Sequence, residues 1–116
     1  MNRGLKPVRW VGSSLRDLKT FPKTVQRHVG QALYAAQCGE EYPTVKALKG
    51  FGGRSVLEIV VDHQTDTWRV IYTVRFGDAI YVLHAFQKKS KKGIATPQRE
   101  PELIRQRLAA AAQDYR

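Results

Sequence analysis

The sequence predicts an α+β fold, with two N-terminal helices on one face of an antiparallel β-meander and a third helix towards the C-terminus. Three observations predict this fold. Apolar residues recur with a helical period in the first third, with a period of two over residues 55–87, and with a helical period again after residue 97. Because the chain has 116 residues and 42% of them are hydrophobic, we expect residues 1–116 to form a single domain.

A short strand and a first helix are expected near the start of the chain. Residues 8–11 are apolar and follow Pro7, which is typical of an edge strand. Ser13 or Ser14 can then cap a helix, because a serine hydroxyl accepts hydrogen bonds from free amide groups in the first turn. The apolar face of this helix would contain Leu15 and Leu18.

Pro22 separates the first helix from a second, antiparallel one. A proline disfavours helical backbone at the preceding residue, here Phe21, and suits the first position of the next helix. Gly39 ends the second helix. Five apolar residues fall on one face of it: Val25, Val29, Ala32, Leu33 and Ala36. Residues 40–53 look irregular, and the glycines around Phe51 are more typical of a flexible turn than of a phosphate-binding loop.

Alternation and a high content of β-branched and aromatic residues predict three strands, at residues 56–61, 68–76 and 79–87. Gly77 and Asp78 indicate a two-residue hairpin between the last two strands, and a short polar turn joins the first two. Neighbouring strands should therefore be antiparallel. Thr96 and Pro97 open a final helix with an apolar face that includes Leu103, Ile104 and Leu108.

Alternation along the middle strand divides its side chains between two faces. Arg69 and Arg75 should lie on an exposed face, because the other set is apolar and should face the helices: Trp68, Val70, Tyr72, Val74 and Phe76. Pairing across the hairpins places Arg69 close to Phe86 and within a few residues of Glu58. We therefore expect one edge of this face to bring together Glu58, Arg69, His84, Phe86 and the lysines that follow.

A dense positive charge follows the last predicted strand. Four of five consecutive residues are lysines: Lys88, Lys89, Lys91 and Lys92. The whole chain has a formal net charge of +10, concentrated in residues 1–27 and 86–107. Two basic patches of this kind favour a nucleic acid, an acidic protein partner, or both.

Each candidate residue also has an ordinary structural interpretation. Arg69 and Glu58 could form only a cross-strand ion pair, worth about 0.2–1 kcal/mol. His84 could be a core residue with satisfied hydrogen bonds, and Phe86 could be either core or a stacking platform for a base. The lysines could belong to a solvated loop, although their density at the end of a strand favours a function.

Several classes of site are not indicated. Cys38 is the only cysteine, which excludes an intramolecular disulfide, and we expect it to be a small buried residue. No set of His, Asp and Glu has the spacing of metal ligands, so we expect no cofactor. The N-terminal residues lack the apolar run of a secretory signal, and no stretch approaches the roughly 20 apolar residues that span a bilayer. We therefore expect a soluble, cytoplasmic protein.

Four segments resemble, in matching order, the phage-derived HigB/RelE-like toxins. They are Leu48-Lys-Gly-Phe-Gly-Gly, Val56-Leu-Glu-Ile, Trp68-Arg-Val-Ile-Tyr and, most specifically, Leu83-His-Ala-Phe-Gln-Lys-Lys-Ser-Lys-Lys. The resemblance implies a RelE-like fold and the toxin of a type II toxin–antitoxin system. Such toxins cleave messenger RNA in the ribosomal A site and are silenced by an antitoxin, here one expected to have a helix-turn-helix domain.

The resemblance also implies roles for individual residues. RNA cleavage without a metal uses a 2′-hydroxyl to attack its own 3′ phosphate, and needs a base, cations for the phosphorane, and a proton for the leaving 5′ oxygen. Arg69 matches the arginine that neutralises the phosphate, and Lys89 and Lys91 match basic positions after the last strand. Other catalytic positions of the family are not matched, so His84 or Glu58 as base and a loop lysine as acid are hypotheses. Further RNA-binding candidates are Lys46, Lys49, Arg54, Phe86, Lys88 and Lys92.

Three functions are compatible with these residues. The first is a ribosome-dependent endoribonuclease that acts as a toxin. The second is a non-catalytic RNA- or ribosome-binding module that uses the same basic edge. In the third, the basic patches serve mainly to hold an acidic antitoxin segment. The first two both predict salt-sensitive RNA binding, so only new RNA ends can distinguish them.

Overall fold

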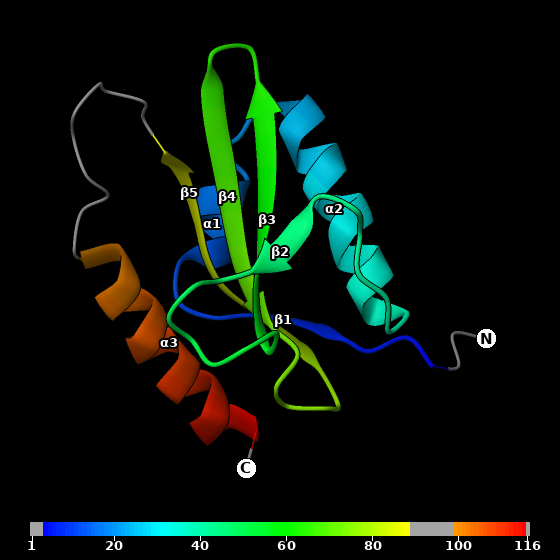
Figure 1. Ribbon diagram of the computed structural model, residues 1–116, viewed down its shortest axis with the longest axis vertical. Helices are drawn as coiled ribbons and strands as arrows, with labels where there is room; N and C mark the ends of the chain where they lie inside the picture. Colours follow the sequence, from blue (N-terminus) through cyan, green and yellow to red (C-terminus); the bar gives the residue numbers. More distant parts are fainter. Residues whose placement is uncertain (1–3, 89–98, 116) are drawn as a thin grey trace.

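The computed structural model describes residues 4–88 and 99–115 (Figure 1). These residues contain, in chain order, β1 (Val8–Trp10), α1 (Ser14–Leu18), α2 (Lys23–Gln37), β2 (Val45–Ala47), β3 (Val56–His63), β4 (Asp66–Thr73), β5 (Ile80–Lys88) and α3 (Arg99–Tyr115). The strands form one sheet in the order β1-β5-β4-β3-β2. β1 is parallel to β5, and the other neighbouring pairs are antiparallel. The predicted α+β class is confirmed, and β1 is the predicted edge strand.

α2 covers one face of the sheet with the apolar stripe that the sequence predicts. Its five members, Val25, Val29, Ala32, Leu33 and Ala36, are all buried and pack against side chains of β3, β4 and β5. Burying a valine or leucine side chain stabilises a fold by roughly 1.5–3 kcal/mol, so this stripe holds α2 in place. The helix begins at Lys23, one residue after Pro22, and Gly39 follows its end with a positive φ of 84°. Cys38 is exposed rather than buried, because it lies at the end of the helix, outside the stripe.

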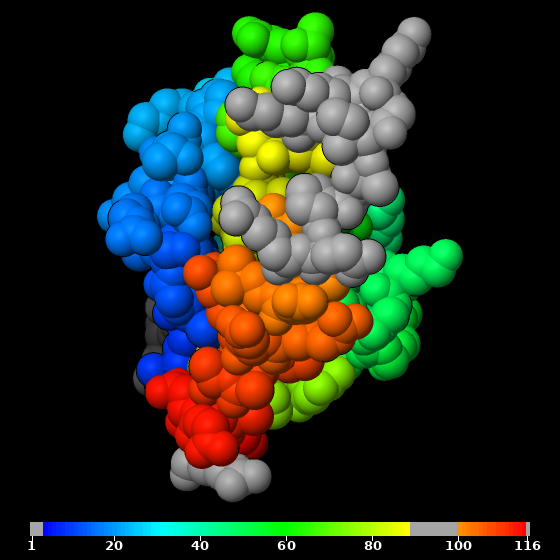
Figure 2. All heavy atoms as spheres, turned by 90° about the vertical axis from the view of Figure 1, so that its left-hand side faces the viewer, coloured from blue at the N-terminus to red at the C-terminus, as the bar shows by residue number. Residues whose placement is uncertain are grey.

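The sequence predicts that the opposite face of the sheet is exposed. In the structure α3 covers part of this face (Figure 1). Ile104 and Ala111 of α3 are buried in a second core cluster with Ile71, Tyr81 and Leu83 of the sheet. Figure 2 looks onto this side, where α3 crosses the surface between the N-terminal segments and the segments around β2. The site predicted on this face must therefore lie beside α3. Thr96 and Pro97, predicted to open this helix, lie outside the described residues.

The connection between β4 and β5 is longer than the predicted two-residue hairpin. β4 ends at Thr73 because the backbone then turns towards the preceding loop: the amide of Val74 donates to the carbonyl of Ser55, and the hydroxyl of Thr73 accepts from the amide of Arg75. Six residues, 74–79, therefore link the strands. Phe76 lies beyond the strand and packs in the cluster with α3, not on the face of α2 as alternation predicts.

The predicted pairing of Arg69 with Phe86 is nevertheless confirmed. The register shifts between Ile71 and Tyr72, which pair with His84 and Val82 respectively, so Leu83 is an extra residue in β5. Thr73 pairs with Tyr81, one residue away from the predicted register, and the bulge restores that register beside Arg69.

β2 was not expected, because residues 40–53 look irregular in sequence. Val45, Lys46 and Ala47 form a strand of three residues that pairs with β3 and adds a fifth strand to the predicted meander. A segment this short has too few residues to show alternation, so its pairing partner decides its conformation.

Candidate functional site

One row of lateral partners crosses four strands of the sheet on the side of α3. Lys46 on β2 pairs with Glu58 on β3, Glu58 with Ile71 on β4, and Ile71 with His84 on β5. The next row contains Arg69 on β4 opposite Phe86 on β5. Side chains two residues apart on a strand share a face, so Arg69 lies on the same face as Ile71. The convergence of Glu58, Arg69, His84 and Phe86 predicted from the sequence is present.

A cleft of about 570 Å³ opens between these strands and the start of α3. Its lining comes from three places: the sheet, the segment around β2, and the first turns of α3. The polar and charged lining residues are Lys46, Lys49, Glu58, Arg69, Lys88, Glu100 and Arg105, and the apolar ones include Ile71, Phe86, Phe51 and Ile104. Six of the residues predicted for the site therefore line one cleft.

Glu58 and Arg69 form an ion pair on the floor of the cleft, from Oε2 of Glu58 to Nη1 of Arg69. The side chain of Glu58 is 8% exposed and that of Arg69 is 19% exposed, so the pair is largely withdrawn from water. Within residues 4–88 and 99–115, Nε of Arg69 is buried and has no hydrogen-bond partner. The ion pair expected as one interpretation is thus present, and it leaves the guanidinium with donors to spare, which suits a bound anion.

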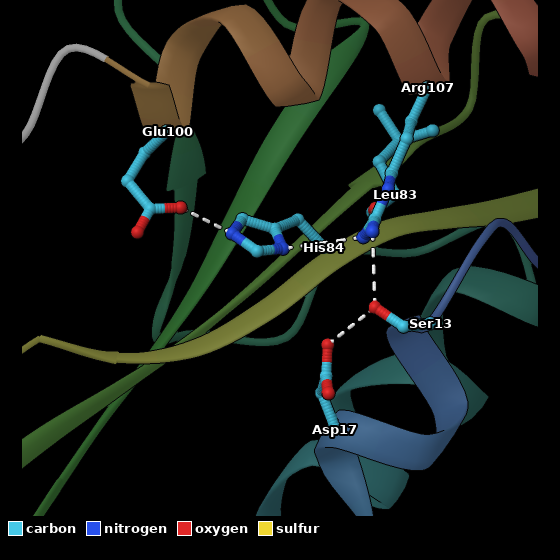
Figure 3. A network of polar contacts seen from close by, with 6 residues as sticks. All are labelled: Ser13, Asp17, Leu83, His84, Glu100 and Arg107. Carbon is cyan, nitrogen blue, oxygen red and sulfur yellow. Dashed lines mark hydrogen bonds and ion pairs between the residues drawn. The ribbon is translucent and has the colours of Figure 1, made fainter.

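His84 lies behind the cleft rather than in its lining, and only 6% of the residue is exposed. Its ring stacks on Phe86 with centroids 4.7 Å apart. Nε2 contacts Oε1 of Glu100, and Nδ1 lies 3.4 Å from Nη1 of Arg107 (Figure 3). Both ring nitrogens are therefore engaged with side chains of α3. Phe86 was expected to be either a core residue or a stacking platform for a base. It is partly buried against His84 and also lines the cleft, so its position is compatible with both.

Arg107 joins three elements behind the cleft. Its Nη1 donates to the carbonyl oxygen of Leu83 at 3.0 Å, and its Nη2 donates to Oγ of Ser13 at 3.0 Å. Ser13 in turn donates to Asp17 at 2.7 Å, so the network runs from α3 through β5 to α1 (Figure 3). Leu83 is the extra residue of the bulge, and a bulge removes a residue from the pairing ladder. Arg107 thus stabilises the irregularity that sets the register of the site.

The remaining predicted cations divide into three groups. Lys46, Lys49 and Lys88 are exposed and line the cleft. Arg54 does not line it; its guanidinium pairs with Glu41, and that hydrogen bond raises the pKa of Arg54 above its ordinary value. The last group, Lys89, Lys91 and Lys92, lies outside the described residues.

Sequence reasoning missed three residues of α3 that belong to the site. Glu100 and Arg105 line the cleft, and Arg107 bonds to the bulge and to His84. Arg105 also lies over the ring of Phe51, 5.2 Å from its centroid, a cation–π geometry that fixes its direction. The helical period predicts that α3 has a polar face, but it carries no information on which strand this face meets.

The arrangement suits a chain of phosphates better than a neutral ligand. Four exposed cations, Lys46, Lys49, Lys88 and Arg105, surround a floor that holds an arginine with free donors and an aromatic ring. Backbone phosphates are bound by such cations, and a base can stack on an aromatic face. Two carboxylates, Glu58 and Glu100, lie on different sides of the same cleft and can exchange protons with a ligand.

The sequence matches a known protein family over most of its length. The family described as "Phage derived protein Gp49-like (DUF891)" matches residues 16–109. The chain belongs to the Gp49-like family. This confirms the resemblance to a phage-derived family that the sequence motifs indicate, and the match extends from α1 into α3, so it includes every lining residue of the cleft.

This Gp49-like chain is similar to a solved structure but to no curated protein sequence. No curated protein matches its sequence. Its structure is similar to a chain in the crystal structure of the toxin–antitoxin complex RelBE2 from Mycobacterium tuberculosis, with 14% sequence identity and a TM-score of 0.49. That similarity covers 77% of this chain and 98% of the other. Within the described residues, none of the helices is long and apolar enough to cross a membrane.

Proposed function

We propose that this Gp49-like protein is the toxin of a type II toxin–antitoxin pair and that it cleaves messenger RNA in the cleft between the sheet and α3. One observation supports this proposal above all. The Glu58–Arg69 pair and the ring of Phe86 lie on the floor of a cleft whose rim carries Lys46, Lys49 and Lys88. Membership of a phage-derived family and the toxin-like motifs of the sequence point the same way.

The proposed chemistry is an attack of a 2′-hydroxyl on the adjacent 3′ phosphate. The 2′ oxygen forms a bond to phosphorus, the bond to the 5′ oxygen breaks, and the products carry a 2′,3′-cyclic phosphate and a 5′-hydroxyl. Arg69 stabilises the extra negative charge of the phosphorane, since it lines the cleft and carries a guanidinium charge. Glu58 holds Arg69 in place, and Phe86 provides a face on which a base next to the scissile phosphate stacks.

The exposed cations bind the RNA backbone. Lys46, Lys49 and Lys88 neutralise phosphates on either side of the scissile one, and Lys89, Lys91 and Lys92 extend the same charge along the chain sequence. The ribosome supplies the orientation of the messenger, in keeping with the toxins that the sequence resembles. Silencing is assigned to an antitoxin with a helix-turn-helix domain, on the strength of the same resemblance.

A second candidate function uses the same surface without chemistry. Because phosphate contacts and stacking need no proton transfer, a non-catalytic RNA- or ribosome-binding module would present the same cations and the same Phe86. The specific observation in its favour is that the oxygen of Glu58 nearest Arg69 is already engaged in an ion pair.

Controlled expression in cells distinguishes the two functions. Wild-type protein should stop growth and create new 5′ ends within coding sequences. Arg69→Lys, which keeps the charge but loses the planar guanidinium, should reduce both effects at least tenfold, whereas Arg16→Lys on the exposed side of α1 should not. Growth arrest without new 5′ ends would support the binding module instead.

A further inference from the structure

We propose that Glu100, at the start of α3, is the general base of the cleft, and that His84 is a positioning residue that holds it. This inference rests on the proposed ribonuclease function. It replaces the sequence-based hypothesis that His84 or Glu58 takes the proton. Glu100 lines the cleft beside Arg69 and Phe86, and it contacts His84 directly.

The hydrogen bonds of His84 fix which nitrogen carries its proton. A guanidinium has only donors, so the contact between Nη1 of Arg107 and Nδ1 of His84 requires an unprotonated Nδ1. In the neutral ring the proton is then on Nε2, which donates to Oε1 of Glu100. This contact orients the carboxylate of Glu100 (Figure 3).

His84 itself does not line the cleft. It is 6% exposed, its ring is covered on one side by Phe86, and both of its nitrogens contact residues of α3. Glu100 lies between His84 and the cleft, with 19% of its side chain exposed. A substrate in the cleft thus meets this pair at the carboxylate of Glu100.

Glu100 is better suited to accept a proton than Glu58. Oε2 of Glu58 bonds to Arg69, so protonating Glu58 would weaken the ion pair that fixes the phosphate-binding guanidinium. The partner of Glu100 is a neutral imidazole, and its N–H can still donate to the carbonyl oxygen of a protonated carboxyl group. Proton uptake at Glu100 therefore leaves its orientation unchanged.

The spacing across the sheet also fits an in-line displacement. Glu58 and His84 are separated by β4, and two strand spacings of about 4.8 Å place their backbones roughly 10 Å apart. The scissile phosphate would lie between them, over Ile71 and against Arg69. Glu100 reaches in from the β5 side and meets the 2′-hydroxyl at one end of the line of attack. The leaving 5′ oxygen is then at the other end, towards Lys46.

The proposed step is balanced in atoms and charge. The 2′-hydroxyl gives its proton to Glu100, and the electron pair left on oxygen forms the bond to phosphorus. The bond from phosphorus to the 5′ oxygen breaks, and that oxygen takes a proton from solvent or from a lysine ammonium group of the rim. Glu100 then loses its proton to water before the next turnover.

Several charged and titratable groups face Glu100 in the free protein. His84 faces it from β5, Arg107 and Arg105 belong to the same helix, and Arg69, Glu58 and the rim lysines face it across the cleft. A general base acts only in its unprotonated form. On the acidic side of the pH profile the rate of cleavage should therefore fall tenfold for each pH unit.

Single-turnover cleavage of a messenger bound to purified ribosomes tests the proposal. Glu100→Gln should lower the rate at least 100-fold and flatten the acidic side of the pH profile. Glu102→Gln is the matched control: it removes the same charge from the same turn of α3 at an exposed position, and its rate should stay within twofold of wild type. His84→Gln, which keeps an amide N–H donor, should retain more activity than His84→Ala.

Chemical rescue separates catalysis from folding. Glu100→Ala leaves space for a small carboxylate, so added formate should raise its rate at least tenfold while leaving wild type unchanged. Full activity of Glu100→Gln, with the wild-type acidic limb, would overturn the proposal while leaving the ribonuclease function intact. An inactive Glu100→Ala that formate does not rescue would also overturn it. If wild type cleaves neither ribosome-bound nor free RNA, the proposed function itself fails.

Discussion

Glu58 and Arg69 form an ion pair across β3 and β4 although neither is the direct lateral partner of the other. Glu58 lies opposite Ile71, and Arg69 lies opposite Val60, so the contact is diagonal. A diagonal pair requires both side chains to lean towards one another along the sheet, and burial then keeps them there. This contact aligns the guanidinium with the cleft, and the proposed chemistry depends on it.

Breaking this pair from one side should destabilise the protein. Arg69→Ala leaves the carboxylate of Glu58 buried without its cation, and we expect a loss of about 1–3 kcal/mol in the free energy of unfolding, less than for a fully buried pair because Arg69 is partly exposed. Glu58→Gln/Arg69→Ala removes the stranded charge and should recover at least half of the loss. Urea unfolding of both variants measures this. Equal losses in both would show that the pair is not coupled.

RNA affinity should depend on salt through the lysines of the rim. Each phosphate contact contributes about 0.7 to the slope of log K against log salt for a single strand, so Lys46→Ala/Lys88→Ala should lower that slope by about 1.4. The measurement is binding to a short RNA with a 2′-deoxy residue, which cannot react. Lys23→Ala/Arg27→Ala, which removes two exposed cations from α2, serves as control and should leave the slope unchanged.

Gly12 should tolerate no side chain, because the guanidinium of Arg107 lies against it. A Cβ at this position would be 2.8 Å from Nε of Arg107, and the φ of Gly12 is +57°. Gly12→Ala should therefore cost about 1–2 kcal/mol of stability and displace Arg107 from Leu83. Gly30→Ala is the contrasting variant, since Gly30 is helical and open, and it should stabilise by about 0.5–1 kcal/mol. Thermal unfolding of the two variants should shift in opposite directions.

Local signals in the sequence predict one part of the fold, and tertiary contacts decide the rest. The stripe of α2, the end of that helix at Gly39 and the pairing of Arg69 with Phe86 were all predictable, because periodicity and hairpin geometry are local properties. The register beside Arg69 agrees with the prediction although the predicted hairpin was too short, because the bulge at Leu83 reverses a one-residue offset between Thr73 and Tyr81.

The contribution of α3 was not predictable in the same way. Its period indicates an apolar face, but only the tertiary fold decides that this face covers the sheet beside Arg69. Glu100 and Arg107 enter the site for that reason, and no short-range spacing links them to His84, which is 16 and 23 residues away in sequence. The three residues of β2 were missed because pairing with β3, rather than their own pattern, makes them a strand.

Tyr72 should make the fold sensitive to alkali. Burial raises the pKa of Tyr72 to about 12, above the ordinary value of 10.0. The unfolded chain therefore loses this proton first, and the associated stability is present below about pH 10 and is lost as the pH rises towards 12. Tyr72→Phe should reduce this loss. Because the hydroxyl is buried with no partner within the described residues, the same variant should be neutral or slightly stabilising at pH 7. Urea unfolding between pH 7 and pH 11 measures both effects.

The chemistry of the RNA ends tests the central claim most directly. Purified protein, ribosomes and a defined messenger are incubated without divalent metal beyond that held by the ribosomes, and the new ends are identified by mass spectrometry. The proposed mechanism predicts a 2′,3′-cyclic phosphate on one fragment and a 5′-hydroxyl on the other, with neither formed when the scissile nucleotide is 2′-deoxy. An intact messenger, or fragments that carry a 5′ phosphate and a 3′-hydroxyl, would contradict it.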